Sequence, residues 1–344
     1  MPAFDVIGIG ALNIDRIYSV PSVITDGAQL IDEVAVDAGG CSANTTYALA
    51  KLGLRCGFLG AVGDDADGQI VLRSFAEVGV DTSHIVRKPG VATGSVLAFA
   101  DEEGNRAMYA DPGANALFER EDLDAAYLAS ARLVLFSSFG GNIPLAVQRA
   151  AVEALPPTAA MALSVDSLLA HDGLDALAEL VGRCTIALAN VDELRELTGL
   201  ELPAAAEALL DLGCQTVVVT FGRGTARQRW MATAAAAGER GERGERGERG
   251  ERGEELPIVC WLLSGDSRWA LPALPTHEGP IVDATGAGDA FAAGFLWAFL
   301  AGEPLLRCAS LGHVAAGFCL ASMGCRAGLP TREALLTRHA RHFG

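Results

Sequence analysis

The chain alternates between short apolar runs and amphipathic helical segments over most of its length. Residues Phe4–Ile9 are mostly apolar and are punctuated by Gly8 and Gly10, which is typical of a buried strand that meets a functional loop. The same patterns predict strands near residues 56–62, 133–136, 160–165, 185–189 and 216–220, and helices at 43–52, 68–78, 143–155, 174–182 and 204–212. Repeated βα units of this kind predict an α/β fold with a doubly wound, mostly parallel sheet flanked by helices.

Two other segments follow a different pattern. Polarity alternates with a period of two along residues 16–38 and again at 95–100 and 106–111, with turn-forming residues at 101–105. Such alternation indicates half-exposed strands, which would form a small sheet apart from the main one. We therefore expect a single domain over residues 1–344 with a β-sheet lid drawn from about 14–38 and 94–112.

Residues 238–253 repeat Gly-Glu-Arg five times and end on glycine, inside a low-complexity insertion at 238–255. This composition cannot form a core, and without proline and with so few repeats a collagen triple helix is not expected. Because the alternating charges cancel locally, we expect a solvated, mobile insertion between two strands. A binding element is the alternative.

Charge and composition narrow the function classes. The chain carries 26 Lys plus Arg against 43 Asp plus Glu, a net charge of -17, which opposes binding to nucleic acids and to anionic membranes. Its eight cysteines contain no C-x-x-C pair, which favours reduced, buried thiols. No signal peptide and no uncharged apolar run of ~18 residues is recognisable. We expect a cytoplasmic protein.

The string Asp283-Ala284-Thr285-Gly286-Ala287-Gly288-Asp289 carries the strongest chemical signal. It precedes an apolar stretch at 290–300 that predicts a buried helix, so the small residues lie at a helix N-terminus. Free N–H groups and the helix dipole there can bind a phosphate as an anion hole, formed by Gly286, Ala287 and Gly288. The adjacent Asp289 is placed to take a proton from an attacking hydroxyl group. A helix cap beside a tight turn is the alternative.

This string resembles the second signature of the PfkB/ribokinase family of carbohydrate and nucleoside kinases, and the resemblance extends over nearly the whole chain in the family's order. It implies a ribokinase-like fold and an ATP-dependent, Mg²⁺-requiring kinase that phosphorylates a hydroxyl group, with Asp289 as general base. In such a reaction the catalytic work is mainly positioning and charge stabilisation.

Two stretches resemble the acceptor side of the family's site. Gly10-Ala11-Leu12-Asn13-Ile14-Asp15 implies that Asn13 and Asp15 bind acceptor hydroxyl groups, and a short amide and carboxylate suit a polyol. An Asx turn is the alternative. Gly39-Gly40-Cys41-Ser42-Ala43-Asn44 resembles the first signature, which implies acceptor contacts for Gly39, Gly40 and Asn44.

Other stretches resemble the nucleotide and cation side. Asn190-Val191-Asp192-Glu193 is similar to the family's N-x-x-E motif, which implies that Asn190 and Glu193 serve phosphate and Mg²⁺, with Glu193 acting through water; a capping box is the alternative, and both can coexist. The resemblance places Thr220, Gly222 and Gly224 at the ATP phosphates and ribose. Asp283 and Thr285 match a monovalent cation site, with K⁺ as the candidate ion. At 164–167 many relatives carry Asp-Pro, where this chain has Ser-Val-Asp-Ser.

Competing functions fit the residues less well. Gly8-Ile9-Gly10 suggests a dinucleotide-dependent oxidoreductase, but Asn13 replaces the third glycine and strand-like alternation replaces the helix. A non-catalytic sugar sensor would require loss of Asp289 or Glu193, and both are present. Sugar and nucleoside acceptors both remain open; with aromatic residues at 6% and no evident base-stacking pair, we favour a sugar. We expect a homodimer formed through the lid.

Overall fold

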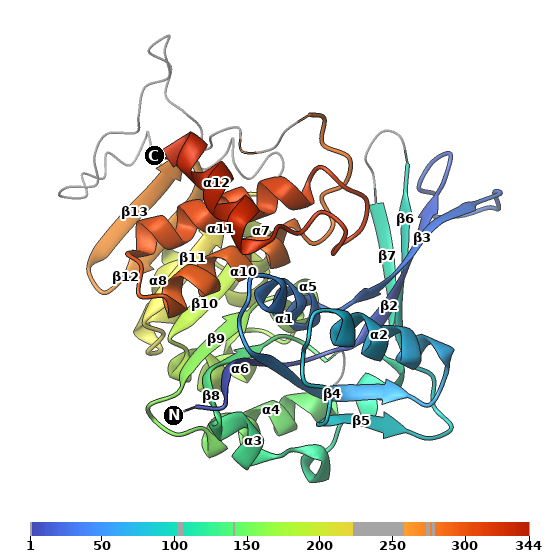
Figure 1. Cartoon of the computed structure of the whole chain (residues 1–344), viewed down its shortest axis with the longest axis horizontal. Coiled ribbons are helices and arrows are strands. Elements are labelled where there is room, and N and C mark those ends of the chain that lie inside the picture. Colours follow the sequence, from blue (N-terminus) through green and yellow to red (C-terminus); the bar gives the residue numbers. More distant parts are fainter. Residues whose placement is uncertain are drawn as a thin grey trace.

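The computed structural model describes residues 2–101, 106–139, 142–222, 258–272, 276 and 279–343. Within these residues the larger sheet has nine strands in the order β13-β12-β11-β10-β9-β8-β1-β4-β5 (Figure 1). In this sheet, β11, β10, β9, β8, β1, β4 and β5 all run parallel to one another. Strands β12 and β13 are added at one edge, and each runs antiparallel to the strand before it. The strands are β1 (Phe4–Ile9), β4 (Cys56–Gly63), β5 (Ile85–Lys88), β8 (Ala131–Phe136), β9 (Ala160–Ser164), β10 (Ile186–Asn190), β11 (Thr216–Thr220), β12 (Ile258–Ser264) and β13 (Ser267–Pro272).

Helices cover both faces of this sheet. One face carries α1 (Cys41–Lys51), α2 (Ala66–Glu77), α10 (Ala287–Leu300), α11 (Leu305–Cys319) and α12 (Arg332–Phe343). The other carries α3 (Ala125–Ala129), α4 (Asn142–Ala154), α5 (Ser167–His171), α6 (Leu174–Arg183), α7 (Val191–Thr198) and α8 (Ala204–Asp211), with the 3₁₀ turns η1 (Gly113–Leu117) and η2 (Arg120–Asp122) nearby. The predicted doubly wound arrangement, a mostly parallel sheet flanked by helices, is confirmed.

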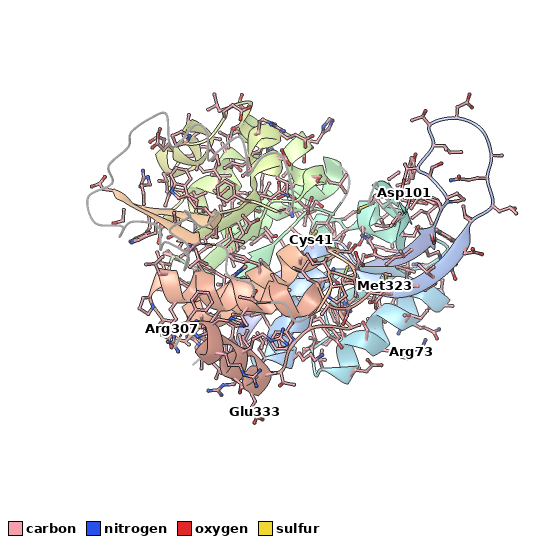
Figure 2. All side chains as sticks on the ribbon, turned by 90° about the horizontal axis from the view of Figure 1, so that it is seen from above. Cys41, Arg73, Asp101, Arg307, Met323 and Glu333 are labelled. Carbon is pink, nitrogen blue, oxygen red and sulfur yellow. The ribbon has the colours of Figure 1, made fainter. Side chains whose placement is uncertain are left out.

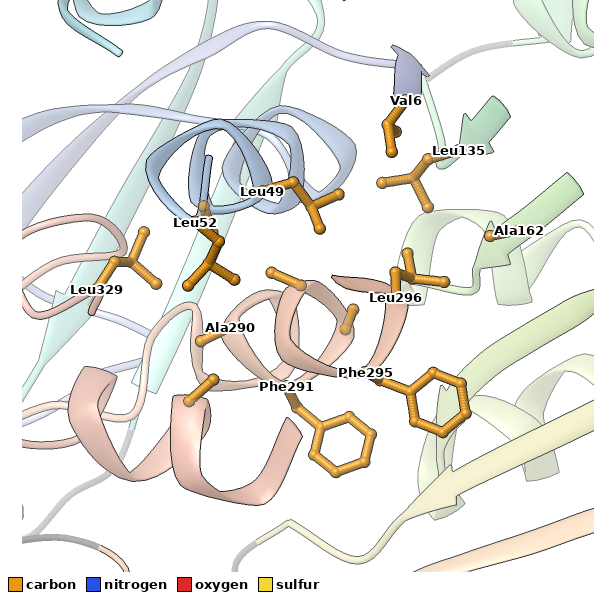
Figure 3. Packing of buried hydrophobic residues seen from close by; sticks show 14 of the residues in the cluster. Val6, Leu49, Leu52, Leu135, Ala162, Ala290, Phe291, Phe295, Leu296 and Leu329 are labelled. Carbon is orange, nitrogen blue, oxygen red and sulfur yellow. The ribbon is translucent and has the colours of Figure 1, made fainter. Parts of the chain in front are cut away.

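The core is split by the sheet because successive strand residues point to opposite faces. Val6 belongs to the cluster under α1 and α10, whereas Ile7 belongs to the cluster under the helices of the opposite face. Figure 3 shows Leu49 of α1 and Leu296 of α10 in the first cluster. These contacts fix the start of α10 beside α1.

Helix α10 packs closely against α11 because glycines lie at the contact. A Cβ on Gly294 would come within 2.7 Å of the Leu311 carbonyl oxygen, and one on Gly312 within 2.7 Å of the Phe291 carbonyl oxygen. Helices α10 and α11 therefore lie too close together to admit a side chain at either position.

A second sheet projects from the body (Figure 1), in the order β3-β2-β6-β7. Its strands are β2 (Asn13–Ser19), β3 (Asp32–Gly39), β6 (Gly94–Ala100) and β7 (Arg106–Asp111). Outer pairs are antiparallel and β2 runs parallel to β6. The expected separate small sheet is therefore confirmed. An ion pair of 2.7 Å between Arg16 Nη2 and Asp67 Oδ2 ties it to α2.

Some predictions fall outside the described residues, namely the insertion at 238–255, part of the turn at 101–105, and Gly224. In the part of the chain that the structure describes, no helix has the length and apolar character needed to cross a bilayer.

Candidate active site

The candidate residues gather where parallel strands end. Asn190 ends β10, Thr220 ends β11, and Asp166 follows the end of β9 by two residues. Asn13 opens β2 just after β1 ends at Ile9. Ligands of open α/β sheets bind outside the carboxyl ends of the strands, so this edge is the expected place for a site.

Asp289 lies in the first turn of α10 and faces α1. Its Oδ2 accepts a hydrogen bond of 3.0 Å from Asn44 Nδ2, and its backbone oxygen accepts one of 3.3 Å from Thr45 Oγ1. The N-cap of α10 is Gly286, which has no side chain to cap the helix. The Asp289 carboxylate is thus held by the neighbouring helix, and the residue is half-buried.

The environment of Asp289 favours its protonated form. Burial raises the pKa of Asp289 to about 7, the Asn44 hydrogen bond opposes this rise, and the carboxylates of Asp166, Asp15 and Glu193 add to it. A carboxylate with a pKa near neutrality is suited to general acid–base chemistry.

The glycines before Asp289 have different surroundings. Gly286 adopts a φ of 75°, and a Cβ there would lie 2.8 Å from Cys325 Cα. A Cβ on Gly288 would meet no atom within 4 Å. Gly286 therefore serves the turn and the packing of α10, whereas Gly288 borders open space at the helix N-terminus, where a phosphate can approach the backbone.

Asn13 and Asp15 lie on β2, beside the start of α1. Asn13 Oδ1 accepts a 2.9 Å hydrogen bond from Asn115 Nδ2, which fixes the amide. Among the described residues, Asp15 Oδ1 has no hydrogen-bond partner although it is sealed from solvent. A buried carboxylate oxygen without a donor is costly, so any hydrogen-bond donor that reached this atom would be stabilising.

Gly39 and Gly40 make room for this arrangement. A Cβ on Gly39 would lie 2.2 Å from Asp15 Oδ2, and one on Gly40, whose φ is 107°, would lie 2.1 Å from the Ala11 carbonyl oxygen. Figure 2 shows the next residue, Cys41, near the centre of the molecule. Both glycines are therefore required for the chain to pass beside Asp15.

Asn190 and Glu193 form the reciprocal capping box at the start of α7. Glu193 N donates to Asn190 Oδ1 at 2.9 Å, and Asn190 N donates to Glu193 Oε2 at 2.7 Å. Burial raises the pKa of Glu193 to about 7, with the Asn190 bond opposing and Asp166 adding to the rise. The capping role is present, and a nearby cation would favour the ionised form of Glu193.

Thr220 ends β11 half-buried, and Gly222 is exposed with a φ of 47° and no atom within 4 Å of a Cβ position. Asp283 is only 5% exposed and accepts hydrogen bonds from Thr285 N (2.9 Å), Thr285 Oγ1 (2.8 Å) and Gly324 N (3.1 Å). These bonds show Asp283 stabilising the loop that leads into α10.

Several residues of this region gave no signal in the sequence. Arg326 is 5% exposed and donates from Nε to Asn44 Oδ1 at 2.9 Å. Asp166 caps α5 and accepts from Ser138 Oγ at 2.8 Å. In the sequence, Asp166 lies in the Ser-Val-Asp-Ser stretch, where many relatives carry Asp-Pro. This departure is the one local feature that could have drawn attention to Asp166.

Comparison with known proteins shows the family to which the chain is similar. The family profile described as pfkB family carbohydrate kinase matches residues 3–226 and 260–332. An uncharacterized sugar kinase of Archaeoglobus fulgidus is 30% identical over 285 residues, covering 82% of this chain and 98% of that protein. The aminoimidazole riboside kinase of Salmonella typhimurium is 28% identical over 276 residues, covering 75% and 72%.

Among solved structures, a putative ribokinase II from E. coli in complex with ATP and Mg²⁺ superposes with a TM-score of 0.76. It is 19% identical, and the match covers 98% of this chain and all of that one. At this identity the likeness shows the ribokinase fold.

The fold and the family match define a kinase that phosphorylates a hydroxyl group of its acceptor. The chain belongs to the pfkB family of carbohydrate kinases.

Proposed function

We propose that this chain, as a single kinase domain over residues 1–344, transfers the γ-phosphoryl group of ATP to a hydroxyl group of a small sugar. Asp289 is the general base, and the backbone of Gly286, Ala287 and Gly288 forms the anion hole. The observation that carries the proposal is the Asp289 carboxylate, held by Asn44 in the first turn of α10 with a pKa raised to about 7. Such a base accepts the hydroxyl proton close to neutral pH.

The start of α10 supplies the second requirement, stabilisation of the charge on the transferred group. Free N–H groups at a helix N-terminus point outward with the positive end of the helix dipole. Open space at Gly288 lets phosphate oxygens approach this turn, in which Ala287 N also donates to Ala284 O at 3.3 Å. The nucleotide would be lined by Asn190, Thr220 and Gly222. Gly224, which lies outside the described residues, is proposed for the same role.

The negative charge of Asp166 and Glu193 would favour an Mg²⁺ ion near this edge. Asp166 raises the pKa of both Glu193 and Asp289, and Glu193 raises that of Asp289, so a divalent cation beside Asp166 and Glu193 would offset this repulsion. Within the described residues, no three His, Cys, Asp or Glu side chains are close enough to ligate one ion directly. Glu193 would therefore hold Mg²⁺ through water, as this ion often retains several waters. When bound, the ion would neutralise negative charge on the phosphates.

The acceptor is proposed to bind over Asn13, Asp15, Gly39, Gly40 and Asn44. Burial raises the pKa of Asp15 to about 6, the Arg326 charge lowers it, and Asp37 adds to the rise. Near pH 7 the carboxylate is ionised, and its buried Oδ1 requires a donor. A polyol supplies neighbouring hydroxyl groups at this position, which favours a sugar; a nucleoside presents the same groups on its ribose and is the alternative.

An acceptor screen tests the proposal. ADP release with Mg-ATP would be measured for pentoses, hexoses, sugar acids and nucleosides, each with and without K⁺ to test the cation site proposed at Asp283 and Thr285. We expect ADP release that depends on a sugar. Release that occurs with nucleosides alone would establish the alternative acceptor class, and release independent of every acceptor would contradict the proposal.

A pair of glycine substitutions separates phosphate binding from folding. We expect Gly288→Ala to keep the wild-type melting temperature, since its Cβ meets no atom within 4 Å, but to lower kcat/KM for ATP by about tenfold or more because the methyl group obstructs the phosphate. Gly286→Ala, which meets Cys325 at 2.8 Å with a φ of 75°, should lower stability itself by about 1–3 kcal/mol. Unchanged ATP kinetics in Gly288→Ala would remove this glycine from the phosphate site.

The lid is the surface on which we propose homodimerisation. Its edge strands β3 and β7 expose apolar side chains at Val34 (48%), Val36 (40%), Met108 (62%) and Tyr109 (60%). Apolar edge strands favour pairing with another chain. We expect light scattering to give a dimer mass and Met108→Glu to give a monomer. A wild-type protein that stays monomeric at high concentration contradicts the paired lid.

A further inference from the structure

Arg326 is a buried arginine in the loop between α11 and α12, and it reaches across to α1 and α2. Its Nε donates to Asn44 Oδ1 at 2.9 Å, and its Nη1 donates to Ser74 Oγ at 2.8 Å. The guanidinium lies 4.8 Å from the centre of the Tyr47 ring and 5.4 Å from that of Phe75. Because burying a guanidinium is costly, this arrangement calls for a reason beyond packing.

The chemistry of these groups determines the orientation of the Asn44 amide. Arginine can only donate hydrogen bonds, so the Asn44 oxygen must face Arg326. The Asn44 nitrogen then faces Asp289 Oδ2, to which it donates at 3.0 Å. A flipped amide would set N–H against the guanidinium and an oxygen against the carboxylate, so both contacts would become repulsive.

We propose that Arg326 is a positioning residue for phosphoryl transfer: it locks the Asn44 amide with its nitrogen toward Asp289 and so keeps the carboxylate of the base aimed at the acceptor. This inference rests on the proposed role of Asp289 as base. Arg326 touches neither reactant in this account and acts through Asn44. Ser74, on α2, anchors the guanidinium from the far side.

The pH dependence of the reaction reports on this bond. Burial raises the pKa of Asp289 to about 7, and the Asn44 hydrogen bond lowers it by favouring the ionised form. A base works only when ionised, so activity should fall as pH drops through this value. Weakening the Asn44 bond raises the pKa further and moves the acidic limb to higher pH. Other titratable groups around Asp289 are Asp15, Asp166, Glu193, Cys41, Cys319 and Cys325.

The positive charge of Arg326 also affects the pKa of two nearby carboxylates. A variant that tests the positioning role must therefore retain this charge. It lowers the pKa of both Asp15 and Asp37, against the burial that raises them. Removing the charge would therefore disturb acceptor binding as well as the base. Arg326→Lys keeps the positive charge but removes the planar group that donates to Asn44 and Ser74 in two fixed directions.

The experiment measures kcat, acceptor KM and the pH profile of kcat/KM for Arg326→Lys. We expect kcat to fall by about tenfold with the acidic limb moved to higher pH by about half a unit or more, and acceptor KM to change by less than about threefold. Arg73→Lys is the matched control: Arg73 precedes Ser74 on α2 and is exposed, and Figure 2 labels it on that helix. It should leave all three quantities unchanged.

A double-mutant cycle shows whether Arg326 acts through Asn44. Adding Arg326→Lys to Asn44→Ala should lower kcat by no more than about twofold beyond Asn44→Ala alone, because the shared path is already broken. If Arg326→Lys fails to fold, Ser74→Ala carries the test and should move the acidic limb in the same direction by a smaller amount. A wild-type pH profile in the folded variant, or additive effects in the cycle, overturns the inference. If Asp289→Asn is inactive, either of these results overturns the role of Arg326 alone and leaves the proposed function intact.

Discussion

Asp289→Asn should lower kcat for phosphoryl transfer by at least about 10²-fold while leaving the Kd for ATP within about threefold of wild type. Asparagine has nearly the shape of aspartate and can still contact Asn44, but it cannot accept the hydroxyl proton. The nucleotide contacts proposed at Asn190, Thr220 and Gly222 involve other residues. The loss should therefore be confined to the chemical step, as measured by ADP release at saturating acceptor and by isothermal titration with ATP.

The fold of this variant provides its own control. Burial raises the pKa of Asp289 from its ordinary value of 3.8 to about 7, so its cost to the folded state is absent below the lower value, grows between the two and is complete above the higher one. Asp289→Asn should accordingly melt at or above the wild-type temperature at pH 8. Asp192→Asn, an exposed carboxylate that pairs with Arg195 at 2.7 Å, is the matched control and should keep full activity. Near-normal turnover of folded Asp289→Asn contradicts the base assignment.

Glu193→Gln should raise the Mg²⁺ concentration needed for half-maximal activity by about tenfold or more. Glutamine preserves the capping box, because its side-chain oxygen can still accept from Asn190 N as Glu193 Oε2 does at 2.7 Å. The start of α7 should therefore remain folded. What is lost is the negative charge that attracts the ion. Activity would be titrated against free Mg²⁺ at fixed ATP, with melting temperature measured in parallel.

The control for this variant lies on the same helix. Glu196→Gln removes an exposed carboxylate on α7 whose described partner is His171 at 3.4 Å, and it should leave the Mg²⁺ titration unchanged. An unchanged titration in Glu193→Gln would mean that this residue serves the capping box alone. A fall in melting temperature with a normal titration would support the same conclusion.

Much of the fold could be predicted because its signals are local. The apolar run at Phe4–Ile9 and the later strands have the period of buried parallel strands, and the period-two segments became the second sheet. Gly286 and Asp289 were placed at a helix N-terminus because a long apolar stretch follows them, and α10 begins at Ala287. Each of these inferences needs only the residues within one or two turns.

The parts of the site that escaped prediction depend on contacts between distant residues. Arg326 meets Asn44 across 282 positions of the chain, and Asn115 meets Asn13 across 102. Arg326 lies in a loop without periodicity, and nothing near it in sequence indicates that it is buried. Asp166 has the local signal of an ordinary helix cap, and its closeness to Glu193 and Asp289 follows only from the order of the strands.

The site concentrates negative charge at a cost to the free protein. Asp15, Glu193 and Asp289 all have a pKa raised first by burial and then by neighbouring carboxylates. Binding of a cation and of hydroxyl donors would relieve both effects, so substrates and Mg²⁺ should stabilise the folded state. This trade between stability and function is common where catalysis requires a desolvated base.

The most direct test of the central claim follows the phosphoryl group itself. The protein would be incubated with Mg-ATP labelled at the γ-phosphorus and with the best sugar from the acceptor screen, and the products would be separated. We expect label on the sugar in amounts equal to the ADP formed, for wild type and not for Asp289→Asn. Label appearing only as inorganic phosphate, or equal transfer by both proteins, would contradict it.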